Sequence, residues 1–212
     1  MHIAIAGNIG AGKTTLAFLL SKYFDFQPFY EDNEQNPYLA DFYADMPQWS
    51  FHLQVHFLHS RLRKIMKIRQ ENLNVIQDRT IYEDAQIFAP NLHAMGLITT
   101  RDYETYKLLF ETIAELVQPP DLLIYLKASV PALVTQIENR NRKYEDSIRI
   151  DYLRKLNERY DEWYQNYTYG KKIEVIVDDL NFRDKPEDLG VVIHRIKMEL
   201  YGLFNQTSLF DE

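Results

Sequence analysis

The chain has 212 residues, of which 46% are hydrophobic, and it contains no cysteine. This composition permits a compact domain with a substantial core, and it excludes disulfide frameworks, thiolate metal sites and cysteine nucleophiles. Its 24 basic and 31 acidic side chains leave a formal charge of −7, so the surface as a whole should repel nucleic acid and anionic membranes. Since no signal-like segment or long apolar run is present, we expect a cytoplasmic protein without nucleic-acid or membrane partners.

Short apolar runs alternate with longer helical patterns along the chain. We predict five buried strands, at His2–Ala6, Gln27–Tyr30, Asn74–Gln77, Leu122–Leu126 and Glu174–Val177. The predicted helices are Lys13–Phe24, Trp49–Gln70, Ile81–Met95, Thr100–Val117, Val130–Arg140, Arg149–Tyr167 and Arg183–Tyr201. This alternation is typical of a parallel sheet flanked by helices. We therefore predict a single α/β domain over residues 1–212, with a loose tail at about 202–212.

A glycine-rich segment separates the first predicted strand from the first predicted helix. Gly7–Thr14 matches the pattern G-x-x-x-x-G-K-[ST] in full. Glycines here bring backbone N–H groups against phosphate oxygens, and the start of the helix adds a partial positive charge. Lys13 would hold the β- and γ-phosphates of ATP, and the Thr14 hydroxyl would bind Mg²⁺. The motif predicts a three-layer fold like that of P-loop NTPases, with a nucleotide site formed by Gly7, Asn8, Gly10, Ala11, Gly12, Lys13, Thr14 and Thr15.

Charged residues follow the second and third predicted strands, at the edge where sheets of this kind place their sites. Glu31 could accept a proton from an attacking hydroxyl, although an N-cap or a solvated loop acid is an equal alternative. Asp78 and Arg79 come directly after the third strand. The aspartate could reach Mg²⁺, and the arginine could neutralise charge on a transferring phosphoryl group. A surface ion pair is the alternative, and the position beside the phosphate loop favours function.

The long helix predicted at Trp49–Gln70 carries polar residues on an apolar face. Gln54 and Arg61 are seven residues apart, so they share a face with Phe57 and Leu58. Buried polar groups need hydrogen-bond partners. These two could contact the edge of a nucleobase or belong to an internal network, and the pattern leaves both interpretations open.

A dense run of charge lies between two of the predicted helices. Arg140-Asn141-Arg142-Lys143 is followed by Glu145-Asp146, and such runs are usually solvated. A junction between helices is also a suitable place for a lid whose arginines close over phosphates and exclude water. We therefore predict a helical lid at about residues 140–147 that brings Arg140 and Arg142 to the nucleotide.

Taken together, these residues resemble the deoxyribonucleoside kinase family, which includes deoxycytidine, deoxyguanosine and deoxyadenosine kinases and the broad-specificity insect enzyme. The resemblance spans nearly the whole chain, and it depends on the order and spacing of several motifs. They are G-N-I-G-A-G-K-T-T at Gly7–Thr15, the strand-end Glu31, Tyr43 and Gln54 eleven residues apart, D-R-T at Asp78–Thr80, and R-N-R-K-Y-E at Arg140–Glu145.

The resemblance implies a role for each matched residue. Glu31 matches the general base at the 5′-hydroxyl of the acceptor, and Arg79 matches the arginine that binds this hydroxyl and the γ-phosphate. Asp78 takes the metal-side acid position, where many animal members have glutamate, so its shorter side chain could bind the metal through water. Tyr43 and Glu145 match the pair that holds the 3′-hydroxyl of a deoxyribose. The implied catalytic set is Lys13, Glu31 and Arg79.

The resemblance also bears on the base and on assembly. Gln54 matches a glutamine that hydrogen-bonds the base, Phe88 matches an aromatic residue that stacks on it, and Arg61 and Asp84 match the pair of cytidine- and purine-selecting members. Carboxylate and amide groups suit adenine and cytosine, can accept guanine and match thymine poorly. Because D-R-T-I-Y-E-D-A resembles bacterial purine members, we favour deoxyadenosine over deoxycytidine or deoxyguanosine. The family further implies a homodimer packed through the long helix 49–70 and its neighbour.

Two alternative functions remain in view. A nucleoside monophosphate kinase, such as a thymidylate kinase, would need a basic residue near Glu31 for the acceptor phosphate, but residues 27–49 contain no arginine or lysine. A regulatory nucleotide-binding switch would bind nucleotide without a small-molecule acceptor, but the guanine-reading motif N-K-x-D is absent. The expected reaction is therefore phosphorylation of the 5′-hydroxyl of a deoxynucleoside, a small-molecule substrate, by ATP with Mg²⁺.

Overall fold

A parallel five-stranded sheet forms the centre of the computed structural model, which describes residues 1–31, 36–142, 145 and 148–202. The strands are β1 (His2–Gly7), β2 (Gln27–Phe29), β3 (Val75–Asp78), β4 (Leu122–Lys127) and β5 (Lys171–Ile176). Their order across the sheet is β2-β3-β1-β4-β5, and every neighbouring pair is parallel. Because β1 is central, the glycine-rich loop that follows it lies in the middle of the carboxyl edge, between the ends of β3 and β4.

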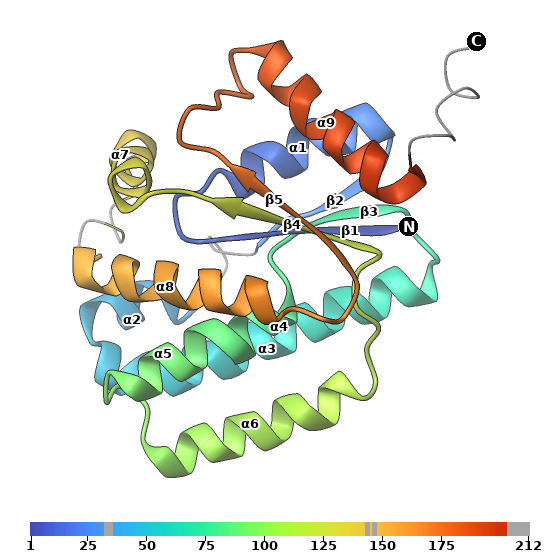
Figure 1. Cartoon of the computed structure of the whole chain (residues 1–212). Helices are drawn as coiled ribbons and strands as arrows, with labels where there is room; N and C mark the ends of the chain where they lie inside the picture. The colour runs from blue at the N-terminus through green and yellow to red at the C-terminus, as the bar shows by residue number, and fades with distance from the viewer. Residues whose placement is uncertain (32–35, 143–144, 146–147, 203–212) are drawn as a thin grey trace.

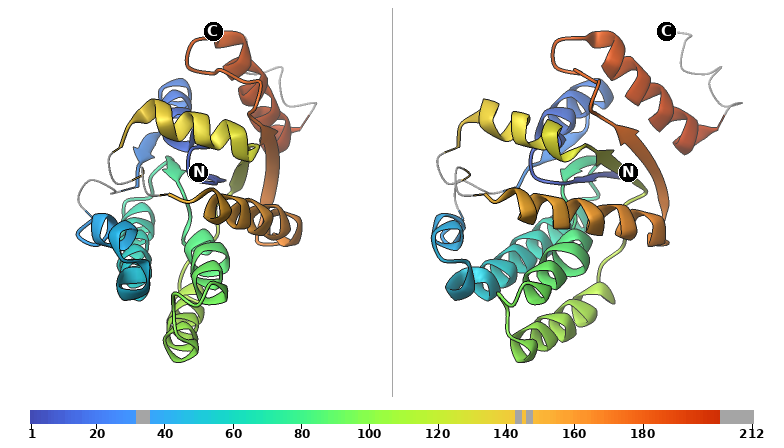
Figure 2. Two further views of the ribbon diagram at one scale, coloured as in Figure 1. Left: turned by 90° about the vertical axis from the view of Figure 1, so that its left-hand side faces the viewer. Right: turned by 60° about the vertical axis from the view of Figure 1, so that its left-hand side comes forward.

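Helices cover both faces of this sheet (Figure 1). One face packs on α1 (Lys13–Phe24), α7 (Val130–Arg140) and α9 (Pro186–Tyr201). The other packs on α3 (Met46–Gln70), α5 (Ala89–Ala94), α6 (Thr100–Ala114) and α8 (Ile150–Asn166), with α6 farthest from the strands (Figure 2). The predicted three-layer α/β fold is confirmed.

The side chains of β1 show how the two faces acquire separate cores. Successive residues of a strand point to opposite faces. Ile3 and Ile5 therefore join the cluster under α1 and α9, whereas Ala4 and Ala6 face the cluster under α3 and α8. All four are completely buried, which fits a central strand of a sheet that is covered on both sides.

The helix predicted at Ile81–Met95 is interrupted in the structure. It begins as α4 (Ile81–Glu83), widens into a π-helical turn η1 (Asp84–Phe88) and continues as α5. The N–H of Ala89 donates to the carbonyl of Asp84, five residues earlier. Pro90 explains the change, because it has no N–H to donate and its ring would collide with the carbonyl four residues before it in a regular helix. The wider turn places Asp84 and Phe88 on the side of the pocket described below.

Several boundaries differ from the sequence prediction. The short helix α2 (Leu39–Ala44) was not predicted, and α3 begins three residues early because the Asp45 side chain accepts from the N–H of Gln48 and caps it. The last strand also begins three residues early, at Lys171. It lies at the edge of the sheet, where only Ile173 and Val175 are buried, so its first half lacks the continuous apolar run expected of a central strand.

The predicted lid and tail are only partly described. Residues 143–144 and 146–147 of the lid, and residues 203–212 of the tail, lie outside the described residues. No helix in the described part of the chain combines the length and apolar character needed to cross a membrane.

Candidate active site

The glycine-rich loop forms an open cradle of backbone at the start of α1. Gly10 and Gly12 have φ values of 89° and 88°, which side chains with a Cβ rarely adopt. A Cβ on Gly10 would also lie 2.8 Å from the carbonyl oxygen of Leu133 on α7. The loop therefore depends on glycine at Gly10 for space and for backbone conformation, as a loop that presents its N–H groups to phosphate requires.

The side chain of Asn8 links the phosphate loop to α8. Its Nδ2 donates to the carbonyl of Leu153 at 3.0 Å and to Oδ1 of Asn157 at 2.9 Å, while its own Oδ1 accepts from the N–H of Ile9 at 2.8 Å. The side chain of Asn8 is therefore bonded to α8 and to the loop itself. The prediction that Asn8 belongs to the nucleotide site stays a prediction, since it concerns the backbone of the loop.

Lys13 is almost fully buried at the end of the loop. Its Nζ donates to the carbonyl of Asn8 at 2.9 Å. Burial and then the nearby charge of Arg79 lower the pKa of Lys13 to about 8, although the carboxylates of Asp78, Glu31 and Glu83 act in the opposite direction. A buried ammonium beside an arginine is stabilised when anionic oxygens reach it. A bound phosphate would therefore stabilise the charged form of Lys13.

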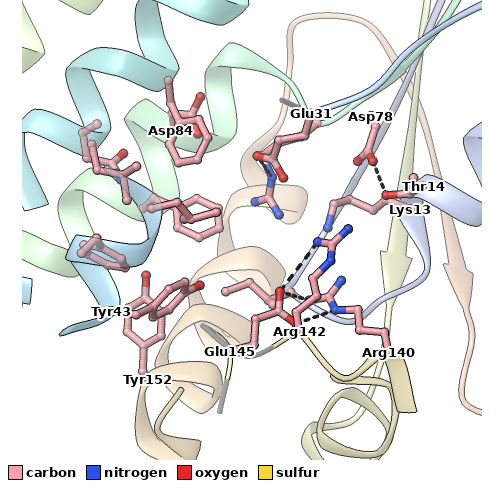
Figure 3. Close-up of a pocket in the computed structure, with 18 residues that line it drawn as sticks. Lys13, Thr14, Glu31, Tyr43, Asp78, Asp84, Arg140, Arg142, Glu145 and Tyr152 are labelled. Atoms are coloured by element: carbon pink, nitrogen blue, oxygen red, sulfur yellow. Dashed lines mark hydrogen bonds and ion pairs between the residues drawn. The ribbon is translucent and has the colours of Figure 1, made fainter. Parts of the chain in front are cut away.

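Thr14 and Asp78 meet beside the loop, as predicted for a metal site (Figure 3). Thr14 Oγ1 donates to Asp78 Oδ2 at 2.6 Å, and Asp78 Oδ1 is buried without a hydrogen-bond partner among the described residues. The described part of the chain contains no group of three His, Cys, Asp or Glu that could hold a metal. Mg²⁺ bound with a nucleotide needs only one or two protein ligands, so the hydroxyl and the unpartnered carboxylate oxygen fit it.

The predicted acid and arginine also meet. Glu31 Oε1 lies 3.2 Å from Nε of Arg79 and 2.6 Å from Nη2 of Arg61. Burial alone would raise the pKa of Glu31, but the charges of Arg79, Arg61 and Lys13 outweigh it and hold this pKa well below its usual range. Glu31 is therefore a carboxylate at neutral pH, beside the cations of the phosphate loop.

Arg61 links Glu31 to Asp84. Its Nε donates to Asp84 Oδ2 in a very short hydrogen bond, and its Nη2 lies 3.3 Å from Oδ1. Burial raises the pKa of Asp84 to about 6, although the charges of Arg61 and Arg79 act against this rise. The sequence left open whether Arg61 contacts a nucleobase or belongs to an internal network. In the structure it belongs to an internal network and does not line the pocket.

The adjoining pocket has an apolar wall and a polar end. Gln54 lines it, and its buried Oε1 has no hydrogen-bond partner among the described residues. Phe88 and Tyr43 line it too, as predicted. Sequence reasoning missed the other apolar side chains of the wall, which come from four separate elements and have no common motif. They are Ile9, Leu39, Phe42, Leu53, Phe57 and Tyr152.

The arginines of the predicted lid face the same pocket (Figure 3). Arg140 makes two hydrogen bonds of 2.6 Å to the carboxylate of Glu145, and Arg142 lies 3.8 Å from it. Tyr43 is close by, and burial, together with Tyr152 and the charge of Glu145, raises the pKa of its phenol well above the usual value. The structure thus brings Tyr43 and Glu145 together, as the resemblance implied.

A second hollow lies on the other side of the phosphate loop. It is lined by Gly10, Gly12 and Thr15, by α7 and by the segment 177–184 after β5. Residues of the phosphate loop thus line both hollows: Ile9, Lys13 and Thr14 line the first, and Gly10, Gly12 and Thr15 line the second.

A phosphate loop at the carboxyl edge of a parallel sheet, with a cation-rich pocket on one side and a second hollow on the other, is the arrangement of a phosphate-loop enzyme that acts on two small molecules. Residues 3–200 match the family model described as deoxynucleoside kinase. The chain therefore belongs to the deoxynucleoside kinase family, and the enzyme class predicted from its sequence is confirmed.

Curated relatives and a solved structure agree with this assignment. The chain is 39% identical to the deoxyadenosine kinase of Dictyostelium discoideum, covering 98% of this chain and 83% of that one. It is 37% identical to a deoxyguanosine kinase of Lactobacillus acidophilus, covering 92% and 88%. The structure of a deoxyadenosine kinase from M. mycoides with bound dATP matches with a TM-score of 0.82 at 30% identity, covering 93% of this chain and all of the other.

Proposed function

We propose that this chain transfers the γ-phosphoryl group of ATP to the 5′-hydroxyl of a deoxynucleoside, and that deoxyadenosine is the preferred acceptor. The observation that carries the proposal is the position of Glu31, whose ionised carboxylate lines the pocket 3.2 Å from Nε of Arg79. In Figure 3, Glu31 lies between Asp84 on one side and Lys13 on the other. An uncharged alcohol in the pocket would therefore face the phosphates across Glu31.

The side chains support an in-line transfer. Glu31 would accept the proton of the 5′-hydroxyl as its oxygen attacks, because an ionised carboxylate within reach can take up a proton. Lys13, Arg79, Arg140 and Arg142 would offset the charge that spreads over the phosphoryl oxygens. Positioning and electrostatics supply most of the rate in such a reaction, because the protein forms no covalent bond.

Thr14 and Asp78 would hold Mg²⁺. An ion held there would supply positive charge that neutralises part of the charge of the phosphates. Asp78 reaches this position from the end of β3, and Thr14 from the first turn of α1.

The polar end of the pocket supports recognition of a base with an exocyclic amine. Asp84 and the unpartnered Oε1 of Gln54 are acceptors for such an amine, and the amide nitrogen of Gln54 can donate to a ring nitrogen. Arg61 keeps Asp84 ionised and oriented. Phe88 would stack on the base. Thymine lacks the amine, so it could not make the hydrogen bonds that Asp84 and Gln54 would offer to an exocyclic amine.

The sugar would be held at the Tyr43 and Glu145 end. Glu145 is buried, Tyr43 is partly buried and the two groups interact, and together they could accept from and donate to a 3′-hydroxyl. Arg140 and Arg142, which would contact the phosphates, both contact Glu145, which would hold the sugar. One cluster of charged side chains would therefore bind both the sugar and the phosphates.

A nucleoside monophosphate kinase is disfavoured by the distribution of charge. Among the described residues, the cationic side chains that line the pocket are Lys13, Arg79, Arg140 and Arg142, all beside the phosphate loop. An acceptor phosphate would need cationic side chains of its own. Here it would compete with the phosphates of the donor for the same four side chains. The second alternative is a regulatory switch that has no acceptor molecule. It does not explain the apolar pocket or the buried Oε1 of Gln54, which has no hydrogen-bond partner among the described residues.

The expected homodimer and the cytoplasmic location stay predictions. The dimer is supported by exposed apolar side chains on and beside α6. Leu108 of α6 is 63% exposed, Leu116 just after the helix is 64% exposed, and Met66 of the adjoining α3 is 49% exposed. A second copy could cover these side chains.

Two assays test the proposed function. Steady-state kinetics with the four deoxynucleosides and their monophosphates as acceptors, at fixed ATP and Mg²⁺, should give the highest kcat/KM for deoxyadenosine and the lowest for thymidine. A thermal-shift screen of the same deoxynucleosides, with and without ATP, reports binding independently of turnover. Phosphorylation of monophosphates alone would overturn the proposal, as would ATP hydrolysis that no deoxynucleoside alters.

A further inference from the structure

Arg79 has a backbone conformation that is uncommon for a long side chain. Its φ is 68°, in the left-handed region, where a residue with a Cβ persists only if its surroundings hold it. It is also the side chain that would contact both reacting molecules. The groups that hold Arg79 in place therefore bear directly on the reaction.

Buried side chains hold both sides of the peptide unit that follows Arg79. Nε2 of Gln77 donates to the carbonyl oxygen of Arg79 at 2.9 Å, and Oε2 of Glu83 accepts from the N–H of Thr80 at 2.6 Å. Gln77 is 1% exposed and Glu83 is completely buried. A rotation of this peptide unit would break two buried hydrogen bonds, which is costly away from water.

A second set of contacts holds the guanidinium itself. Nη1 of Arg79 donates to the hydroxyl of Tyr160 at 2.7 Å, and this hydroxyl donates to Oε1 of Glu83 at 2.9 Å. The tyrosine ring is fully buried between Phe88 and Tyr125. Its hydroxyl has one hydrogen, so it accepts from the arginine and donates to the carboxylate.

Glu83 connects these contacts to the phosphate loop. The same Oε1 accepts from the N–H of Gly7 at 3.3 Å, where β1 enters the loop. One buried carboxylate is thus bonded to the start of the loop and to the turn after Arg79, and through Tyr160 it reaches the guanidinium. The separation between the loop and Arg79 is therefore set by groups that do not line the substrate pocket.

We propose that Tyr160 and Glu83 are positioning residues that hold the Arg79 guanidinium at the site of phosphoryl transfer. The proposal depends on the proposed function, since it concerns the same reaction. Neither residue would touch substrate, and each would act through Arg79. Their loss should therefore lower kcat while leaving the binding of ATP nearly unchanged, because misplacement of a catalytic group affects the transition state most.

A double-mutant cycle tests this role. Tyr160→Phe removes only the hydroxyl and keeps the buried ring, so the variant should fold. We expect kcat with deoxyadenosine to fall about tenfold and the Kd for ATP to change less than about twofold. In an Arg79→Lys background the same substitution should lower kcat less than about twofold, because the group on which Tyr160 acts is gone. Glu83→Gln should behave in the same way, with a larger fall in kcat.

Tyr125→Phe is the matched control. Tyr125 is a buried tyrosine whose ring stacks on Tyr160 and whose hydroxyl also donates to a carboxylate, that of Asp161. Among the described residues, its hydroxyl bonds to Asp161 and its ring packs on Tyr160 and Tyr164. Its hydroxyl does not act on Arg79, so kcat should stay within about twofold of the parent value.

The outcomes separate this inference from the proposed function. With an active parent enzyme, an equal fall in kcat from Tyr160→Phe in both backgrounds, or no fall at all, would overturn the positioning role alone. A rise in the Kd for ATP that matches the fall in kcat would also overturn it, since that is the signature of a disturbed loop. A parent enzyme that phosphorylates no deoxynucleoside would overturn both.

Discussion

The lowered pKa of Lys13 predicts that binding of ATP weakens as the pH rises above neutrality. In the free protein this pKa is about 8, because burial and the neighbouring Arg79 disfavour the charged lysine. Bound phosphates would favour the charged form and raise the pKa again. ATP binding would then be accompanied by uptake of a proton, and such binding loses affinity as the pH rises through the pKa of the free group.

The size of the effect follows from the fraction of protonated lysine. With a pKa near 8, this fraction falls from about 90% at pH 7 to about 10% at pH 9. The Kd for ATP should therefore rise roughly tenfold between these pH values, which corresponds to about 1.4 kcal/mol of binding free energy. The terminal phosphate of ATP is already largely ionised at pH 7, so its own titration contributes little.

Isothermal titration calorimetry at constant ionic strength and free Mg²⁺ would measure this change. Titrations in two buffers of different ionisation enthalpy would report the uptake of protons directly. Lys13→Arg is the control, because arginine stays charged over the whole range, and its Kd should vary little with pH even if its affinity is lower throughout. A flat profile for the parent protein between pH 7 and 9, or an equal slope in the arginine variant, would refute the reasoning.

Four other predictions address separate parts of the site. Glu31→Gln should lower kcat by about 10²-fold or more with little change in the Kd for ATP, measured by steady-state kinetics and calorimetry; unaltered turnover would remove Glu31 from the reaction. Gly10→Ala should weaken ATP binding at least tenfold, because its Cβ would lie 2.8 Å from a carbonyl oxygen at a φ of 89°. An unchanged Kd would contradict the claim that the loop binds ATP and needs glycine at this position. Asp84→Asn should lower kcat/KM for deoxyadenosine by about 10²-fold and for thymidine much less, and equal losses would argue against base recognition. Leu108→Glu should convert a dimer into a monomer in light scattering, whereas a monomeric parent would exclude the proposed interface.

The motifs that the sequence revealed share a physical property: they are local. The phosphate loop, the strand-end Glu31 and the Asp78-Arg79 pair each need only a strand and the residues after it, and parallel strands bring their carboxyl ends to one edge. The sheet itself was predictable for the same reason, since buried strands such as β4 are continuous apolar runs.

What the sequence could not show depends on contacts between distant segments. Tyr160 and Glu83 are 77 residues apart, and Tyr160 lies outside the D-R-T-I-Y-E-D-A motif that holds Arg79 and Glu83. Asn8 matched the loop pattern, but its partners, Leu153 and Asn157, come from α8. The role of Arg61 required its burial to be known, because a polar residue on an apolar helix face can serve a ligand or a network equally well.

The two ends of the pocket are joined by Arg61. Its guanidinium contacts Asp84 at the end assigned to the base and Glu31 at the end assigned to the reaction. Glu31 in turn contacts Arg79, so a chain of charged contacts runs from the base to the phosphates. A base that moves Asp84 would thereby move the carboxylate that accepts the proton. If Asp84 reads the base as proposed, acceptors that fit it poorly should lose turnover as well as affinity, because Arg61 contacts both Asp84 and Glu31.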